Sequence, residues 1–270
     1  MDDSIRSAGQ AGISSLYHYQ DFQPGPHADR LADILKNHRI YCSNPSDFND
    51  PWDCKPYFDL DALDDPANQA ATAESLIATQ RGGPKGDKMD DLLRTNLAVL
   101  KKVMQRFFED QVEFIPKRWG VYCLSPDPCI TLMWSHYSRN HRGICLEFGV
   151  DNSKFVGAQR VRYQKEYPAL LLHDPALPSK MLLIKSDVWA YEQEFRLICP
   201  RYTDVKDLPI IMDGNYLPIA PNDLKSIIVG CQASDETIEA VKMLVREHAL
   251  GVAVRRAKRA PNKYRLVIEG

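Results

Sequence analysis

Two apolar runs, Gly120-Val121-Tyr122-Cys123-Leu124-Ser125 and Ile144-Cys145-Leu146-Glu147-Phe148, set the fold class of this chain. Each run is short and rich in strand-forming residues, which predicts two buried strands. Between them, Asp127-Pro128 predicts the start of a short helix through Trp134 and Tyr137. Aspartate caps a first helical turn, and proline fits the first helical position.

Further strands and helices flank this region without regular alternation. Strands are predicted at 16–19, 39–43, 194–198, 227–229, 252–254 and 264–268, and helices at 31–37, 92–108 and 234–245. This mixture predicts an α+β fold, with a mixed, largely antiparallel sheet and flanking helices, rather than a doubly wound parallel sheet.

The chain is expected to form one domain. Residues 1–15 are polar and predict a flexible N-terminus, and residues 16–270 predict a single α+β domain. A mainly helical insertion is expected at about 60–118, after the second strand. Residues 61–91 are poor in large apolar side chains and contain a Gly- and Pro-rich run, which favours an insertion over a domain boundary.

The composition is that of a globular protein. Of the 270 residues, 44% are hydrophobic and 26% charged, and the formal net charge of -2 excludes binding to nucleic acid or membranes through bulk charge. No apolar run approaches the roughly 20 residues of a membrane helix, and the polar start of the chain does not read as a signal peptide. We therefore expect a cytoplasmic protein without a membrane partner.

No metal site and no standard catalytic motif is expected. The seven cysteines include no C-x-x-C pair, and His136 and His141, five residues apart, would point to different faces of a helix. Glycine-rich phosphate loops and the nucleophile elbow are also missing from the sequence. A Cys/His nucleophile pair stays open, with no particular cysteine singled out.

The loop Phe48–Asp53 predicts a turn that carries a core residue. Asn49 and Asp50 are expected to bond their own backbone, Pro51 fixes one backbone angle, and Trp52 is expected to fill the core.

Glu192-Gln193-Glu194 allows two interpretations. If a strand runs through this segment, both carboxylates point to one face, where each raises the pKa of the other. They either meet a cationic partner in a functional site or lie on a solvated face beside Arg196. His136 and Tyr137 either face a pocket or pack beside the core residue Trp134.

Basic residues cluster near the C-terminus, around a Pro-Asn turn. This cluster forms either a solvated hairpin or a patch that faces phosphate groups and so indicates a phosphorylated partner. Its members are Arg255, Arg256, Lys258, Arg259, Lys263 and Arg265.

Four segments, taken in order, resemble the bacterial Domain of Unknown Function 2971 family. The resemblance runs from about Leu16 to Gly230, and the family name implies no activity. The segments are Leu16-Tyr17-His18-Tyr19, Ser43-x-Pro45-x-x-Phe48-Asn49-Asp50-Pro51-Trp52-Asp53, Met133-Trp134-Ser135-His136-Tyr137 and Trp189-x-Tyr191-Glu192-x-Glu194-x-Arg196.

More distantly, the order of elements resembles ADP-ribosyltransferases of the His-Tyr-Glu kind, which use NAD as a substrate. This resemblance implies that His18 holds the adenosine ribose, that Tyr137, or in its place Tyr122, stacks on nicotinamide, that Glu194 is catalytic and that Glu192 activates the acceptor. The residues implied in NAD binding are His18, Tyr19, Ser43, Asn49, Tyr122 and His136.

The resemblance therefore implies an enzyme that cleaves the nicotinamide–ribose bond and transfers ADP-ribose to a protein, nucleic acid or metabolite. These residue types suit that chemistry, because a carboxylate opposes the positive charge of an oxocarbenium-like transition state. Two alternatives remain. One is a non-catalytic binding or sensor module, and the other is a metal-independent nuclease or phosphodiesterase that uses His18 or His136.

Overall fold

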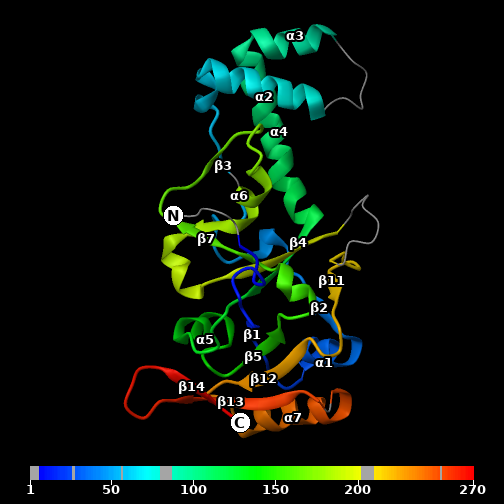
Figure 1. Ribbon diagram of the computed structural model, residues 1–270, viewed down its shortest axis with the longest axis vertical. Coiled ribbons are helices and arrows are strands. Elements are labelled where there is room, and N and C mark those ends of the chain that lie inside the picture. The colour runs from blue at the N-terminus through cyan, green and yellow to red at the C-terminus, as the bar shows by residue number, and fades with distance from the viewer. Residues whose placement is uncertain (1–5, 26–27, 56, 80–86, 202–209, 250) are drawn as a thin grey trace. The chain divides into compact units, whose positions relative to one another are not determined.

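The computed structural model describes residues 6–25, 28–55, 57–79, 87–201, 210–249 and 251–270 (Figure 1). The chain divides into two compact units. Unit 1 comprises Met1–Asn44, Trp119–Val161 and Val188–Gly270, and unit 2 comprises Pro45–Arg118 and Arg162–Asp187. Unit 2 is therefore built from two segments that are far apart in the sequence.

The largest sheet of unit 1 has five strands. Their order is β1 (Ser15–Gln20), β5 (Ile144–Gly149), β12 (Leu224–Val229), β13 (Ala253–Arg259) and β14 (Leu266–Glu269) (Figure 1). Neighbouring strands are antiparallel except β12 and β13, which are parallel. The helix α7 (Asp235–His248) connects these two, as a parallel crossover requires.

A smaller sheet of unit 1 has the order β4, β10, β6. Its strands are β4 (Trp119–Leu124), β10 (Phe195–Pro200) and β6 (Gln159–Arg160), and a separate pair joins β2 (Arg39–Tyr41) to β11 (Tyr216–Pro218). Single bridges connect Tyr17 to Ser125 and Ser43 to Val121. The chain after β2 and the strand β1 therefore both lie beside β4.

Apolar side chains at helical spacing bury the helices of unit 1 against its sheets. The helix α1 (Ala28–Asn37) buries Leu31, Ile34 and Leu35, and α7 buries Val241 and Val245. The Ser234 hydroxyl accepts the Thr237 N–H and caps α7, as the sequence predicts. The remaining helical segments are α5 (Thr131–Tyr137) and short 3-10 turns at Lys154–Gly157 and Asp187–Glu192.

Unit 2 is mainly helical. Its helices are α2 (Pro66–Thr79), α3 (Asp87–Thr95), α4 (Leu97–Arg118) and α6 (Leu177–Leu183), with 3-10 turns at Pro45–Asp47 and Asp61–Asp64. Two short parallel pairs join β3 (Tyr57–Phe58) to β8 (Ala169–Leu170) and β7 (Arg162–Gln164) to β9 (Ile184–Ser186). Its core includes Leu76, Leu93, Leu100 and Phe108.

The predicted α+β class is confirmed. The helix predicted at 92–108 is instead two helices, because the Asn96 side chain accepts the Val99 N–H and starts a new one. The helix predicted to start at Asp127-Pro128 begins at Thr131, since Asp127 forms a local turn by accepting the Cys129 N–H.

The predicted domain boundaries stay a prediction. The two compact units divide the chain at other positions. Unit 2 begins before the expected insertion at about 60–118 and takes in a second segment, and residues 80–86 lie outside the described residues. Of the N-terminal segment 1–15, the described part includes Ala8, which is buried and donates its N–H to the Ala158 carbonyl. No helix among the described residues is long and apolar enough to span a membrane.

The prediction that Trp52 fills the core is wrong. Its side chain is 64% exposed, because Asp50 turns inward and accepts the Trp52 backbone N–H at 2.9 Å. The local Asx-type turn is as predicted, but it buries the carboxylate instead of the indole. The core tryptophan is Trp134, which is 0% exposed and donates its indole N–H to the Pro128 carbonyl at 2.8 Å.

We expect two tryptophan substitutions to differ sharply in stability. Trp134→Ala should lower the free energy of unfolding by about 3–5 kcal/mol, because it leaves a cavity in the core. Trp52→Ala should cost less than about 1 kcal/mol, since the indole is mostly in solvent. Chemical denaturation followed by circular dichroism measures both, and similar losses would contradict the burial described here.

Candidate functional site

A cavity of about 430 Å³ lies within unit 1. It is lined from β1, α1, β2, β4, β11 and the residue Ser43, and its size falls within the roughly 300–1,000 Å³ typical of small-molecule sites. Three of the residues predicted to bind NAD line it, namely His18, Ser43 and Tyr122. The bridges of Tyr17 to Ser125 and of Ser43 to Val121 bring their three segments together.

His18 is held in a defined protonation state. Its Nδ1 lies 2.8 Å from the Cys123 carbonyl oxygen, and its ring stacks on Tyr122 with centroids 4.2 Å apart. Burial, with a smaller contribution from the Arg30 charge, lowers the pKa of His18 to about 4, so the ring is neutral at pH 7. Because a carbonyl only accepts, Nδ1 carries the proton and Nε2 is left as an acceptor.

Two buried polar atoms in this wall have no hydrogen-bond partner among the described residues. They are the amide nitrogen Nε2 of Gln20 and the hydroxyl of Tyr122, and both residues line the cavity. Burial raises the pKa of Tyr122 well above its ordinary value, so the hydroxyl stays protonated and is available to donate. Buried polar groups are normally bonded, so these two indicate a place for a polar ligand.

Aromatic and cationic side chains form another part of the cavity wall. The rings of Tyr41 and Tyr216 meet edge to face with centroids 5.6 Å apart. The Arg39 guanidinium lies 4.1 Å from the Tyr216 centroid and pairs with Asp33 at 2.9 Å, and Arg30 lies 5.9 Å from the Tyr41 centroid. This part of the wall offers aromatic faces for a base and cations for phosphate groups.

None of the predicted catalytic residues lines this cavity, and they form two contacts elsewhere in unit 1. The Tyr137 hydroxyl donates to Glu192 at 2.7 Å. Glu194 accepts two hydrogen bonds from Arg196, at 2.8 and 2.9 Å. Glu194 and Arg196 are both buried, so this pair is not the solvated strand face that the sequence left open.

The assumption of a strand through Glu192-Gln193-Glu194 is wrong. Glu192 ends a 3-10 turn, Gln193 has a positive φ of 49°, and β10 begins only at Phe195. The turn at Gln193, and not strand periodicity, therefore sets the directions of the two carboxylates. A left-handed residue of this kind is rarely foreseen from sequence.

The other predicted NAD-binding residues lie outside the cavity lining. Tyr19 packs edge to face on Trp134 and donates its hydroxyl to the Asp127 carbonyl, because alternate residues of β1 face opposite ways. His136 lies in an aromatic cluster with Tyr137, Trp189 and Tyr191. Asn49 is exposed in unit 2. Their roles stay predictions.

A second cavity of unit 1, about 790 Å³, is basic. Arg259, Lys263 and Arg265 line it. Two other cations of the predicted basic cluster are paired outside it, Arg255 with Glu147 and Lys258 with Glu269. Arg256 does not line it either, so the cluster divides and only part of it is directed to this cavity.

The sequence singled out no cysteine, whereas the structure brings Cys231 to His141 in the wall of the basic cavity. The sulfur lies 3.8 Å from His141 Nδ1, and the Ser135 hydroxyl lies 3.1 Å from Nε2. Burial raises the pKa of Cys231 and lowers the pKa of His141. The thiol and the imidazole are therefore both neutral, which is not the state of an activated nucleophile.

Comparison with known proteins adds one finding. A family model described as "Protein of unknown function (DUF2971)" matches residues 133–197, a span that runs from α5 to β10 and includes Tyr137, Glu192 and Glu194. The chain is similar to that family over those residues, a shorter span than the sequence resemblance from about Leu16 to Gly230. No curated protein and no solved structure matches.

Among the described residues, no group of three or more metal-binding side chains forms a candidate metal site.

We expect His18 to titrate far below an ordinary histidine. NMR of the imidazole should give a pKa of about 4. Because the unfolded chain binds this proton more strongly, the stabilising contribution of neutral His18 is complete above about pH 6.5 and is lost as the pH falls toward 4, by about 1–3 kcal/mol. His18→Asn identifies the resonance, and a midpoint near 6.5 would contradict the buried, carbonyl-bonded ring.

Proposed function

We propose that unit 1 binds NAD and acts as an ADP-ribosyltransferase-like enzyme, cleaving the nicotinamide–ribose bond and transferring ADP-ribose to an acceptor. The observation that carries this proposal is the cavity of about 430 Å³, in which His18, Ser43 and Tyr122 converge from three segments. The unpartnered atoms of Gln20 and Tyr122 add hydrogen-bond donors that a dinucleotide would use.

The cavity offers each chemical group of NAD a suitable partner. The Nε2 of neutral His18 accepts a bond from a ribose hydroxyl, and the Tyr122 hydroxyl donates to an oxygen of the ligand. The faces of Tyr41 and Tyr216 stack with a base, and the Arg30 guanidinium compensates the charge of the pyrophosphate.

Catalysis in this proposal rests on the two glutamates. Breaking the glycosidic bond places positive charge on the ribose, which a carboxylate opposes, and the resemblance assigns that role to Glu194 although Glu194 does not line the cavity. The Arg196 guanidinium donates two hydrogen bonds to the Glu194 carboxylate and fixes its orientation. Glu192, oriented by the Tyr137 hydroxyl, positions or deprotonates the acceptor.

One observation favours a second candidate, a non-catalytic module that binds NAD or a related nucleotide as a signal. Both oxygens of Glu194 are engaged by Arg196 inside the protein, so much of the charge that catalysis needs is already balanced. In that case NAD stabilises the fold without being consumed. The third candidate, a nuclease that uses His18 or His136, has no comparable observation in its favour.

The acceptor in the enzymatic proposal carries a phosphate group. Arg259, Lys263 and Arg265 line the basic cavity of unit 1, and none of the described carboxylates forms an ion pair with them. Exposed cations gathered at one cavity attract an anionic partner, whether protein, nucleic acid or metabolite.

We expect Tyr122→Phe to stabilise the free protein and to weaken NAD binding. Removing an unpartnered buried hydroxyl recovers a desolvation cost of about 1 kcal/mol, while the loss of a donor to the ligand should weaken binding about fivefold to tenfold. Thermal denaturation with and without NAD, together with calorimetric titration, measures both effects.

Tyr19→Phe is the matched control for Tyr122→Phe. The Tyr19 hydroxyl is bonded to the Asp127 carbonyl outside the cavity, so its loss should destabilise the protein and leave NAD affinity unchanged. In the wild type, NAD at 100 times its dissociation constant should add about 2.7 kcal/mol of stability. No stabilisation at millimolar NAD would remove both leading candidates.

We expect Glu194→Gln to reduce nicotinamide release about 10²–10³-fold, the usual effect of losing one electrostatic contributor. Glu192→Gln should reduce ADP-ribose transfer more than NAD hydrolysis. Because Glu194→Gln leaves Arg196 buried without its carboxylate, the double variant with Arg196→Gln keeps the measurement interpretable if the single variant unfolds.

Glu147→Gln serves as a control, since Glu147 is an ion-paired carboxylate of the same unit outside the predicted catalytic set. It should leave nicotinamide release unchanged. Binding of NAD by the wild type without any release of nicotinamide would instead establish the sensor candidate.

A further inference from the structure

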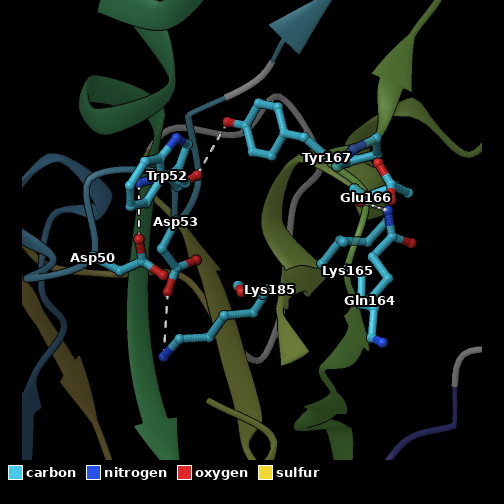
Figure 2. Close-up of a pocket in the computed structure, with 11 residues that line it drawn as sticks. Asp50, Trp52, Asp53, Gln164, Lys165, Glu166, Tyr167 and Lys185 are labelled. Carbon is cyan, nitrogen blue, oxygen red and sulfur yellow. Dashed lines mark hydrogen bonds and ion pairs between the residues drawn. The ribbon is translucent and has the colours of Figure 1, made fainter. Parts of the chain in front are cut away.

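A third cavity, of about 250 Å³, lies entirely within unit 2. Its walls come from the turn that carries Asp50, Trp52 and Asp53, from the last residue of β7 and the segment after it (164–168), and from β9. Figure 2 shows Trp52 and Asp53 on one side of this space and Tyr167 on the other. The parallel pairing of β7 with β9 positions two of these walls against each other.

Three ionisable side chains are buried in this wall. Asp50 and Asp53 are each 3% exposed, and Lys185 is 7% exposed. The Lys185 ammonium lies 3.5 Å from Asp53 Oδ2, so one carboxylate faces a counter-ion (Figure 2). Asp50 uses Oδ1 to accept the Trp52 N–H, and no described residue bonds its Oδ2. Burying a charge without a partner costs free energy, and a ligand of opposite charge would recover that cost. The Asp50 carboxylate in the cavity wall is therefore a candidate binding group.

Carboxylates outnumber ammonium groups among the side chains that line this cavity. The inner wall carries two carboxylates against one ammonium, and the charges of Lys165 and Glu166 cancel. Burial, followed by the charge of Asp50 and by smaller effects of Cys54 and Asp53, raises the pKa of Tyr167 to about 12. The hydroxyl of Tyr167 therefore experiences the carboxylates in spite of Lys185.

Two aromatic rings lie at the edge of these charges. Trp52 is 64% exposed and Tyr167 is 41% exposed, although large aromatic side chains are usually well buried. The Tyr167 hydroxyl donates to the Trp52 carbonyl at 3.1 Å, which ties the two walls together (Figure 2). Exposed indole and phenol faces beside carboxylates are the elements of a site for organic cations.

We propose that this cavity of unit 2 binds a small organic cation, a guanidinium or ammonium group on a short apolar body. The cation pairs with the Asp50 carboxylate, its positive face lies against the Trp52 ring, and its apolar body contacts Tyr167. Asp53 and Lys185 hold the wall in place. An anionic ligand would meet an excess of carboxylates, and a neutral ligand would leave Asp50 without a counter-charge.

The test compares two probes of the same shape on the full-length protein. Butylguanidinium carries the charge, and butylurea is its neutral analogue. Titration calorimetry should show saturable binding of butylguanidinium with a dissociation constant of about 1 mM, as befits so small a ligand, and binding of butylurea at least about tenfold weaker. No NAD is present, so the result is independent of the function proposed for unit 1.

Two variants locate the site. Asp50→Asn keeps the turn and removes the charge, and Trp52→Ala removes an exposed ring that the fold does not need. Each should weaken butylguanidinium binding about tenfold. Glu109→Gln is the control, because Glu109 is an exposed carboxylate of α4 in the same unit. This variant should bind butylguanidinium with the affinity of the wild type.

The proposal is overturned if butylguanidinium shows no saturable binding at concentrations up to about ten times the expected dissociation constant. It is also overturned if the two probes bind equally, or if Trp52→Ala binds with wild-type affinity. Should Asp50→Asn fail to fold, Trp52→Ala and the neutral probe still decide the question.

Discussion

Pairing of β1 on both of its sides is the constraint on which the rest of unit 1 depends. Along its length β1 pairs with β5, and at Tyr17 it also bridges to Ser125, the residue directly after β4. The strand thereby links the five-stranded sheet to the smaller one. His18 follows Tyr17 directly, so its ring reaches the Cys123 carbonyl and stacks on Tyr122. The cavity of about 430 Å³ forms because this junction holds residues of separate sheets side by side.

Strand alternation at the same junction divides the neighbouring aromatic residues between two roles. Leu16 and Tyr122 belong to the larger apolar cluster of unit 1, whereas Tyr19 joins Trp134 in a smaller one on the opposite side. His18 and Gln20 share the face that borders the cavity. A shift of one residue in the pairing of β1 would exchange these faces and remove the cavity wall.

Local patterns predicted much of this fold but little of its site. The strand β1, the strand β5 and the Ser234-capped helix α7 follow from periodicity and capping, which act between near neighbours in sequence. The cavity wall could not be predicted in the same way, because Arg30 and Tyr216 are far apart in the chain and meet only through tertiary packing. The same reason explains the error on Trp52, since the Asp50 turn that keeps the indole in solvent looks like any other Asx-type turn.

The buried polar groups among the described residues differ in whether they have a hydrogen-bond partner within the chain. Glu194 and Arg196 are joined by two hydrogen bonds. The Tyr122 hydroxyl and the Gln20 amide have no such partner, and each costs about 1–3 kcal/mol relative to an unfolded chain that bonds them to water. Proteins are stable by only about 5–15 kcal/mol, so two such groups are a large fraction of the total. Under the proposed function, a polar ligand in the cavity of about 430 Å³ would recover that cost and so couple its own binding to the stability of the fold.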